Sequence, residues 1–409
     1  MRNYLAFLLL ILAAHTAMNQ SLDDYLEVAL QNNPDLKAAY FSFEAQLEKV
    51  EQVKFLTNPT LGFGYFISPI ETRLGSQQTK ISLSQIFPWF GTLSAKKAAA
   101  SLIAAAQFEQ FRSKQALLTF KVKTAYYNYL EALELLEIHR QNLSIMKSHK
   151  NMAKIAYSNG KSKNTEVLDA NLMLDEITSN IQILDQRLDL LKRSFNRLLN
   201  RPDSLKITAT TLAEPTDLNI NKDPDSTLAH HPKMAALEQQ MAAAIIDENV
   251  ARKNGLPQIG VGIDYMVIQP LDGSMVKNNG KDALMPMVSL SLPIFRKKYQ
   301  SQIREIQLYQ KQLAAQKKQL QNTLTIEWVT AQNQRFESQA QYDLDEKRIQ
   351  NANQKITFAF SDFRVANGNF KNILEAQKNL LKFKLSQVTW KRNYAEALAK
   401  MTYLISKEL

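Results

Sequence analysis

The residue types that act as thiol nucleophiles or bind transition metals are scarce in this chain of 409 residues, which has no cysteine and five histidines. There is no cysteine, which excludes thiol nucleophiles, cysteine-ligated zinc and iron–sulfur clusters. The histidines are too scattered for a transition-metal enzyme: they are His15, His139, His149, His230 and His231. Carboxylates such as Asp169, Asp175 and Glu176 stand in a helical stretch without a partner base or ligand set. We therefore expect no catalytic residue, no cofactor and no metal site.

The composition favours long helices. Only 11 glycines and 12 prolines occur in the chain, whereas a loop-rich β fold of this length needs many more turn residues. The formal net charge is +11, which is compatible with nucleic acid, an anionic membrane surface or a lysine-rich solvated face, and does not choose among them. Because the Lys and Arg residues are spread along the helices, we disfavour a nucleic-acid-binding protein.

The N-terminus resembles a secretory signal. Residues 1–3 form a short positive start, and residues 4–14 form an apolar run of the length typical of a signal sequence. This run is too short to span a bilayer as a helix, which takes about 20 residues. We therefore predict a signal peptide over residues 1–20, cleaved between Ala14 and Gln20. No other stretch approaches about 18 consecutive apolar residues, so a helical membrane span is not expected.

The chain then repeats itself. Four pairs of segments recur in the same order at a spacing of about 200 residues. These pairs are residues 21–36 with 226–234, 58–65 with 256–263, 81–84 with 288–291, and 167–170 with 373–376. The sequence therefore predicts a first structural repeat over residues 21–200, a connector over 201–225 and a second repeat over 226–409.

Each repeat has the same predicted plan: a helix, two short alternating runs that form a β-hairpin, a very long helix and a further helix. The first helices are expected over about residues 22–54 and 225–254. The long helical stretches cover residues 92–157 and 296–363 and contain no proline. Their apolar residues recur at spacings of three and four, which is typical of amphipathic or coiled-coil helices. The predicted fold is mainly α, with long helical hairpins and four β-strands.

The alternating runs present one apolar face and one face of small and polar residues. The second face comprises Thr60, Gly62, Gly64, Ser82, Ser84, Gln258, Gly260, Gly262, Asp264, Ser289 and Ser291. Alternation alone favours a sheet that half covers a soluble core. The export signal, the polar hairpin loops and the long flanking helices instead favour tilted transmembrane strands whose small polar face lines a water-filled lumen.

Four strands cannot close a barrel, and lipid does not tolerate open sheet edges, because their unpaired backbone groups find no water there. Closure therefore requires several chains. Three copies would supply about 12 strands, which lies within the range of outer-membrane barrels. The same symmetry would arrange the helices of the three chains as a tunnel around a common axis.

Several segments together resemble the outer-membrane efflux factors of the TolC type. They are the Ala-Leu-x-x-Asn-Pro-x-Leu opening at Ala29–Leu36, the aromatic corner at Phe87–Gly91, and the tip pattern that runs from Tyr157 through Gly160 to Ala170. The resemblance covers essentially the whole mature chain. It implies a homotrimeric conduit with a 12-stranded barrel and no catalytic centre. It also implies two partners, a periplasmic adaptor (membrane fusion) protein and an inner-membrane transporter.

The resemblance further implies a location and a docking site. The chain would lie in the outer membrane of a Gram-negative bacterium, mostly in the periplasm, and without cysteine it would not be lipidated. The adaptor would dock at the turns after the long helices, on residues Gly160, Ser162, Asn164, Thr165, Glu166, Val167, Asn367, Gly368 and Asn369. The second turn departs from the family pattern, because Ala366 stands in place of the usual glycine.

The predicted function is the exit duct of a tripartite efflux system, which conducts substrates passively from the adaptor and pump to the outside. One alternative is the outer-membrane duct of a type I protein secretion system. Another is a periplasmic coiled-coil scaffold or adaptor, which would not need duplicated strands of membrane-spanning length. The sequence does not distinguish among a metal ion, a drug and a polypeptide as the transported substrate.

Overall fold

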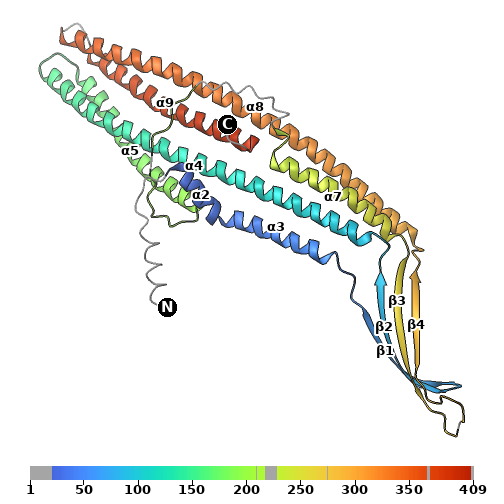
Figure 1. Ribbon diagram of the computed structural model, residues 1–409. Coiled ribbons are helices and arrows are strands. Elements are labelled where there is room, and N and C mark those ends of the chain that lie inside the picture. The colour runs from blue at the N-terminus through green and yellow to red at the C-terminus, as the bar shows by residue number, and fades with distance from the viewer. Residues whose placement is uncertain (1–20, 209, 217–227, 274, 366–368, 407–409) are drawn as a thin grey trace, which may run out of the picture. The chain divides into compact units, whose positions relative to one another are not determined.

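The computed structural model describes residues 21–208, 210–216, 228–273, 275–365 and 369–406. The predicted signal peptide and two residues of the second predicted docking turn, Asn367 and Gly368, lie outside the described residues. The elements, in chain order, are α2 (Leu22–Asn32), α3 (Pro34–Gln52), β1 (Thr60–Thr72), β2 (Gly75–Phe87), α4 (Thr92–Ser158), α5 (Asn164–Leu198), α7 (Pro232–Asn254), β3 (Gln258–Gln269), β4 (Ala283–Ser291), α8 (Arg296–Arg364) and α9 (Phe370–Ile405) (Figure 1). The predicted mainly α chain with four strands is confirmed.

The two long helices match their predicted extents closely. Helix α4 has 67 residues and α8 has 69, and each ends one residue beyond the predicted stretch. Figure 1 shows α4 with α5, and α8 with α9, as two helical hairpins. Within the described part of the chain, no helix combines the length and the hydropathy needed to cross a membrane.

The first predicted helix, residues 22–54, is divided in two at Asn33. The residue before a proline is pushed out of the helical region, and Asn33 has an extended ψ of 124°. Its side-chain oxygen accepts hydrogen bonds from the backbone N–H groups of Asp35 (3.0 Å) and Leu36 (3.2 Å). Pro34 then occupies the first position of α3, where its missing N–H is not needed. The Asn-Pro motif therefore ends one helix and begins the next.

The chain forms two compact units, and each draws on both halves of the sequence. The helical unit contains the described residues of Met1–Ala38, Arg112–His231 and Asn322–Leu409. The sheet unit contains Ala39–Phe111 and the described residues of Pro232–Gln321. Helices α3, α4 and α8 contribute residues to both units.

The helical unit is built on a core shared by α4, α5, α8 and α9. The buried side chains of this core are Met146, Ala153, Ala170, Ile177, Ala359, Phe370, Ile373 and Leu374. The described part of the predicted connector packs on the same unit, because Ile207 and Leu212 are buried. The N–H of Thr208 donates to the hydroxyl of Tyr25 at 2.8 Å, and the N–H of Leu212 donates to the Glu134 carboxylate at 2.7 Å.

The sheet unit contains one antiparallel sheet in the order β1-β2-β3-β4. Strands β1 and β2 have 13 residues each and are longer than the alternating runs predicted from the sequence. The pairing resumes beyond an irregularity after Tyr65 and continues to Thr72 and Gly75 at the turn. The polar residues predicted to form the hairpin loop are therefore part of the strands. The alternating apolar residues alone predict strands that are shorter than those observed.

Candidate functional site

The strand register brings the eleven residues predicted to face the lumen to one side of the sheet. Thr60 pairs with Ser84, and Ser84 with Gly262; in the next row Ser82 pairs with Asp264. Because alternate residues of a strand share a face, the remaining predicted residues fall on the same side. We call this side the polar face. Its orientation toward a lumen stays a prediction.

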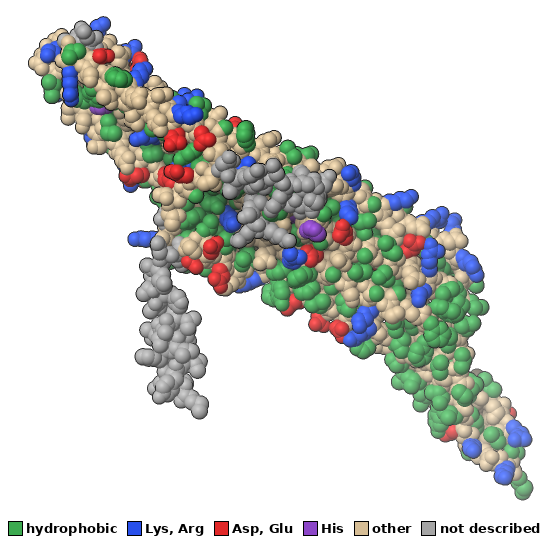
Figure 2. Space-filling view, turned by 45° about the horizontal axis from the view of Figure 1, so that its top comes forward, with side chains coloured by type: hydrophobic (Ala, Val, Ile, Leu, Met, Phe, Trp, Pro, Cys, Tyr) green, Lys and Arg blue, Asp and Glu red, His purple; other side chains and the backbone are tan. Residues whose placement is uncertain are grey.

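The opposite side, which we call the apolar face, is exposed. Its side chains are Leu61, Phe63, Tyr65, Ile81, Leu83, Val261, Ile263, Tyr265, Leu284, Val288 and Leu290. The largest exposed fractions belong to Val288 (75%), Phe63 (73%) and Leu61 (72%). Figure 2 shows hydrophobic side chains gathered over the strands. A continuous apolar surface of this kind marks contact with lipid or with another protein.

Glycines let the polar face pack closely. A Cβ atom at Gly260 would lie 2.2 Å from the hydroxyl oxygen of Ser289, its neighbour on β4. A Cβ atom at Gly62 would lie 2.6 Å from the hydroxyl of Ser82. The serine hydroxyls therefore fill space that the glycines leave open, which explains why small residues face each other across these strands.

Sequence reasoning missed several residues of the polar face. The Lys80 ammonium lies 2.6 Å from the carboxylate of Asp264, whose side chain is fully buried. Met285 and Met287 lie on the same face, because they pair with Asp264 and Gly262. The alternation of β4 could have revealed both methionines, had it been extended back through Pro286. The Lys80–Asp264 pair depends on the register between β2 and β3, so the sequence of neither strand alone could have predicted it.

The first helical tip is a turn built around Gly160. Its φ is +68°, the left-handed conformation that glycine adopts without strain. The N–H of Gly160 donates to the carbonyl of Tyr157 (3.0 Å) and that of Lys161 to the carbonyl of Ala156 (2.8 Å). These two bonds form a Schellman motif, which satisfies carbonyls at the end of α4. The tip is therefore a structurally defined turn whether or not a partner binds it.

The predicted docking residues around this turn differ in accessibility. Asn164 and Thr165 are exposed in the first turn of α5, and Ser162 is half-buried. Glu166 is buried and accepts a hydrogen bond from the Ser162 hydroxyl. Val167 packs against the core of the helical unit. The exposed part of the predicted site is therefore narrower than the sequence pattern.

At the second tip, Asn369 caps helix α9. Its side chain accepts a hydrogen bond from the N–H of Lys371 at 2.9 Å. Asparagine is among the best residues at this position, because its short side chain reaches an otherwise unpaired backbone donor. A structural role thus accounts for Asn369, and docking would be an additional one.

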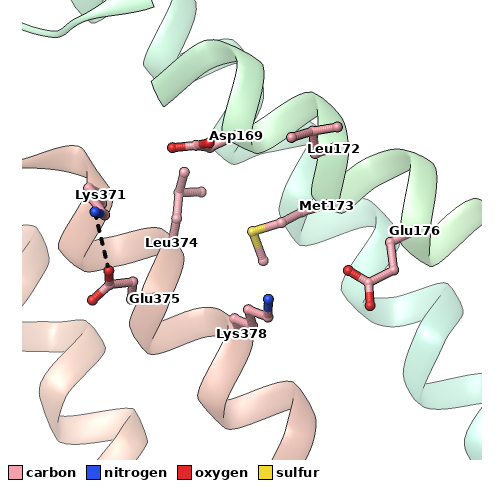
Figure 3. A pocket seen from close by; sticks show the side chains of 8 residues that line it. All are labelled: Asp169, Leu172, Met173, Glu176, Lys371, Leu374, Glu375 and Lys378. Carbon is pink, nitrogen blue, oxygen red and sulfur yellow. Dashed lines mark ion pairs between the residues drawn. The ribbon is translucent and has the colours of Figure 1, made fainter. Parts of the chain in front are cut away.

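A groove runs between α5 and α9 beside the tips. Its lining residues are a mixture of apolar and charged side chains: Asp169, Leu172, Met173, Glu176, Lys371, Leu374, Glu375 and Lys378 (Figure 3). Lys371 and Glu375 form an ion pair at 3.8 Å on α9. The groove continues along the same two helices toward His139 and Asn180. Sequence reasoning did not identify this groove, because its two walls are about 200 residues apart in the chain.

His149 lies in the core of the helical unit near the tips. Its ring centroid lies 5.5 Å from that of Phe360 and 6.4 Å from that of Phe370. Burial lowers the pKa of His149, because the apolar surroundings disfavour the charged imidazolium. Among the described residues, no three His, Cys, Asp or Glu side chains converge on a point where a metal ion could bind.

Residues 25–196 match the family model of the outer membrane efflux proteins. The description of this family is that of an efflux protein, in agreement with the expectation of a transport protein rather than an enzyme. A comparison with curated proteins found no match.

The fold matches solved outer-membrane channels over nearly the whole chain. CusC, whose crystal structures concern folding and transmembrane channel formation, has a TM-score of 0.81 at 16% identity, covering 95% of this chain and 92% of that one. The outer membrane protein VceC of Vibrio cholerae has a TM-score of 0.77 at 16% identity, covering 95% and 96%. The CmeC outer membrane channel of Campylobacter jejuni has a TM-score of 0.76 at 16% identity, covering 94% and 85%. The predicted resemblance to the outer membrane efflux proteins is therefore confirmed by the family model over residues 25–196, and the solved structures show that the chain shares their fold over about 95% of its length.

Proposed function

We propose that this chain is the exit duct of a tripartite efflux system in the outer membrane of a Gram-negative bacterium. Three copies close a 12-stranded barrel, and their helices extend into the periplasm as a tunnel. Substrates pass through without chemical change, and the energy comes from an inner-membrane transporter. The observation that carries the proposal is the exposed apolar face opposite a small polar face.

The sheet supports a membrane barrel made from several chains. Strands β1 and β4 each have a neighbour on one side only, so the sheet has two open edges. If the apolar face meets lipid, those edges must pair, since hydrocarbon offers no hydrogen-bonding partner to backbone groups. If β1 of one copy pairs with β4 of the next, the unpaired backbone groups of both edges find partners. Repeating this contact around a common axis closes the barrel. A periplasmic scaffold offers no reason for such a sheet.

The tip and the groove support adaptor docking. The groove between α5 and α9 combines apolar side chains such as Leu172 and Leu374 with acidic residues on α5 and lysines on α9. An amphipathic helix can place its apolar stripe along such a groove and pair its charges with the rims. Asn164 and Thr165 add exposed polar groups at the adjoining turn. We therefore propose a helical segment of a periplasmic adaptor as the partner.

The proposed duct is tested by extraction and conductance. The protein should leave the outer-membrane fraction only with detergent, have the mass of three chains, and open discrete channels in a planar bilayer. A soluble monomer without conductance would contradict the proposal.

Docking is tested separately by crosslinking in cells. Because the sequence has no cysteine, one introduced cysteine provides a unique attachment point. Thr165→Cys should crosslink to an adaptor through a short bifunctional reagent. Gln141→Cys, which is also exposed on a helix, serves as the matched control and should not. Equal crosslinking at both positions would argue against a docking site at the tip.

A further inference from the structure

The end of the sheet where the strands meet the helices is strongly basic. All four strands reach the helices at this end, because Thr60, Phe87, Gln258 and Ser291 begin or finish β1 to β4 there. The joining segments, residues 51–57, 88–97, 252–257 and 292–299, contain eight Lys or Arg residues and one acidic residue, Glu51. We call this end the junction.

The other end of the sheet has no such excess. Its two turns, residues 68–79 and 269–283, contain three basic residues, Arg73, Lys277 and Lys281, and three acidic ones. The net charge is therefore zero at the turns and +7 at the junction. The asymmetry identifies the junction, rather than the whole sheet, as the cationic surface.

Most of the basic side chains of the junction are exposed, and several of them stand beside aromatic rings. Six of them are exposed: Lys54, Lys97, Arg252, Arg296, Lys297 and Lys298. The Lys54 ammonium lies 5.6 Å from the centroid of the Phe55 ring, and the Lys298 ammonium lies 5.9 Å from that of Tyr299. Phe90 and Phe295 are 78% and 76% exposed. Aromatic rings followed by lysine and arginine are typical of the boundary between hydrocarbon and headgroups.

Local partners neutralise only part of this charge. Lys54 pairs with Glu51, and Arg252 pairs with Glu248 at 2.5 Å. In the described residues, no carboxylate forms an ion pair with Arg296, Lys297 or Lys298. These three residues also open helix α8, where positive charge opposes the helix dipole. Their placement is unfavourable within the chain alone and becomes favourable when anions are close.

We propose that the junction binds the headgroups of acidic phospholipids in the leaflet of the outer membrane that faces the helices. The inference rests on the proposed function, because it needs the apolar face to lie in the bilayer. Phosphate groups of that leaflet then stand at the level where the apolar face gives way to the basic residues. Each basic side chain near an anionic surface favours binding by about fivefold, the equivalent of about 1 kcal/mol.

The position of Trp89 allows a direct test. It lies between β2 and α4, 37% exposed, and only three tryptophans occur in the chain. The trimer is reconstituted in vesicles of phosphatidylcholine and phosphatidylglycerol in which one lipid or the other carries brominated acyl chains. The quenching of tryptophan fluorescence by the bromine atoms is then measured. The Trp89→Phe variant gives the contribution of the other two tryptophans, which is subtracted. We expect severalfold preferential quenching by brominated phosphatidylglycerol, declining as salt screens the charges.

Two matched triple variants locate the preference. Arg296→Gln, Lys297→Gln and Lys298→Gln together should remove most of it. Arg73→Gln, Lys277→Gln and Lys281→Gln together remove the same number of charges at the opposite end and should preserve it. Should the first triple variant fail to assemble, Lys54→Gln with Lys97→Gln makes the same comparison on other segments. Equal quenching by the two lipids in the unmodified protein, or equal loss in both variants, would overturn the proposal.

The same experiment separates this inference from the proposed function. Quenching by both brominated lipids without a preference would leave the strands in the bilayer and refute only the acidic-lipid site. The absence of quenching by either lipid would mean that Trp89 does not approach a bilayer, which would contradict the membrane barrel itself.

Discussion

A charge introduced on the apolar face tests the membrane assignment most directly. Val288 suits this purpose because it is 75% exposed and adjoins Met287, the central residue of β4. In a bilayer, Val288→Arg would place a guanidinium close to the middle of the hydrocarbon layer. Ser289→Arg introduces the same side chain one residue away, on the polar face. The pair of variants therefore differs in the face that receives the charge and hardly in its depth.

The expected difference is large. An arginine on the lipid face near the midplane of a barrel costs about 2–4 kcal/mol, and three copies in a trimer would cost about 6–12 kcal/mol together. On the polar face the guanidinium remains in water and incurs little of this cost. Most natural domains have a stability of about 5–15 kcal/mol, so the first variant should lose much of its folded trimer.

Both variants are measured by trimer abundance in the outer-membrane fraction and by urea-dependent folding into vesicles. Val288→Arg should be strongly depleted, whereas Ser289→Arg should assemble and shift the channel toward anion selectivity, because three positive charges would line the lumen. Comparable depletion of both variants would show that β4 is merely sensitive to bulk. Normal assembly of Val288→Arg would mean that the apolar face does not meet lipid, and the reasoning would fail.

Three further outcomes follow from single residues. Burial lowers the pKa of His149, so the unfolded chain takes up its proton before the folded chain does as the pH falls below about 6.5, and this residue should lower stability there by at most about 1.4 kcal/mol per pH unit. His149→Leu should therefore reduce the fall in the urea midpoint between neutral and mildly acidic pH, and the part due to His139, whose pKa burial also lowers, should remain. Asn33→Ala removes the cap of α3 and the 3.0 Å bond to the Leu198 carbonyl, and should lower stability by about 1–2 kcal/mol in urea unfolding. Gly160→Trp should reduce substrate export without lowering trimer abundance, whereas Gly160→Ala, with the same left-handed backbone cost but a small side chain, should export normally; parallel loss of trimer and export would mean a purely structural role.

The sheet faces could be predicted because their signal is local and repeated. Every second residue from Thr60 to Gly64 and from Gln258 to Asp264 is small or polar, and a period of two fixes the face of each side chain once the strand forms. The long helices were predictable for a similar reason, since no proline interrupts them. The duplicated order reinforced both inferences.

Features that depend on contacts between distant segments could not be predicted. The Lys80–Asp264 pair arises only when β2 and β3 adopt their register. Near the first tip, the pattern indicates a turn but not which side chains of the next helix point inward; thus Glu166 is buried although it was predicted to dock a partner. The groove between α5 and α9 likewise combines residues that no local window contains.

The position of the charge is more informative than its total. The net charge of +11 did not distinguish among possible partners. The four joining segments of the junction nevertheless carry a net charge of +7, whereas the net charge of the strand turns is zero. Strands of 9–13 residues at about 3.3 Å per residue separate the two ends by about 30–40 Å. Salt at physiological strength screens charges beyond about 8 Å, so neither end senses the other. The charge of the junction is therefore balanced by ions or charged groups in its own surroundings. The comparison of brominated phosphatidylglycerol with brominated phosphatidylcholine tests whether acidic headgroups are among them, and the two triple variants test whether the preference arises at the junction.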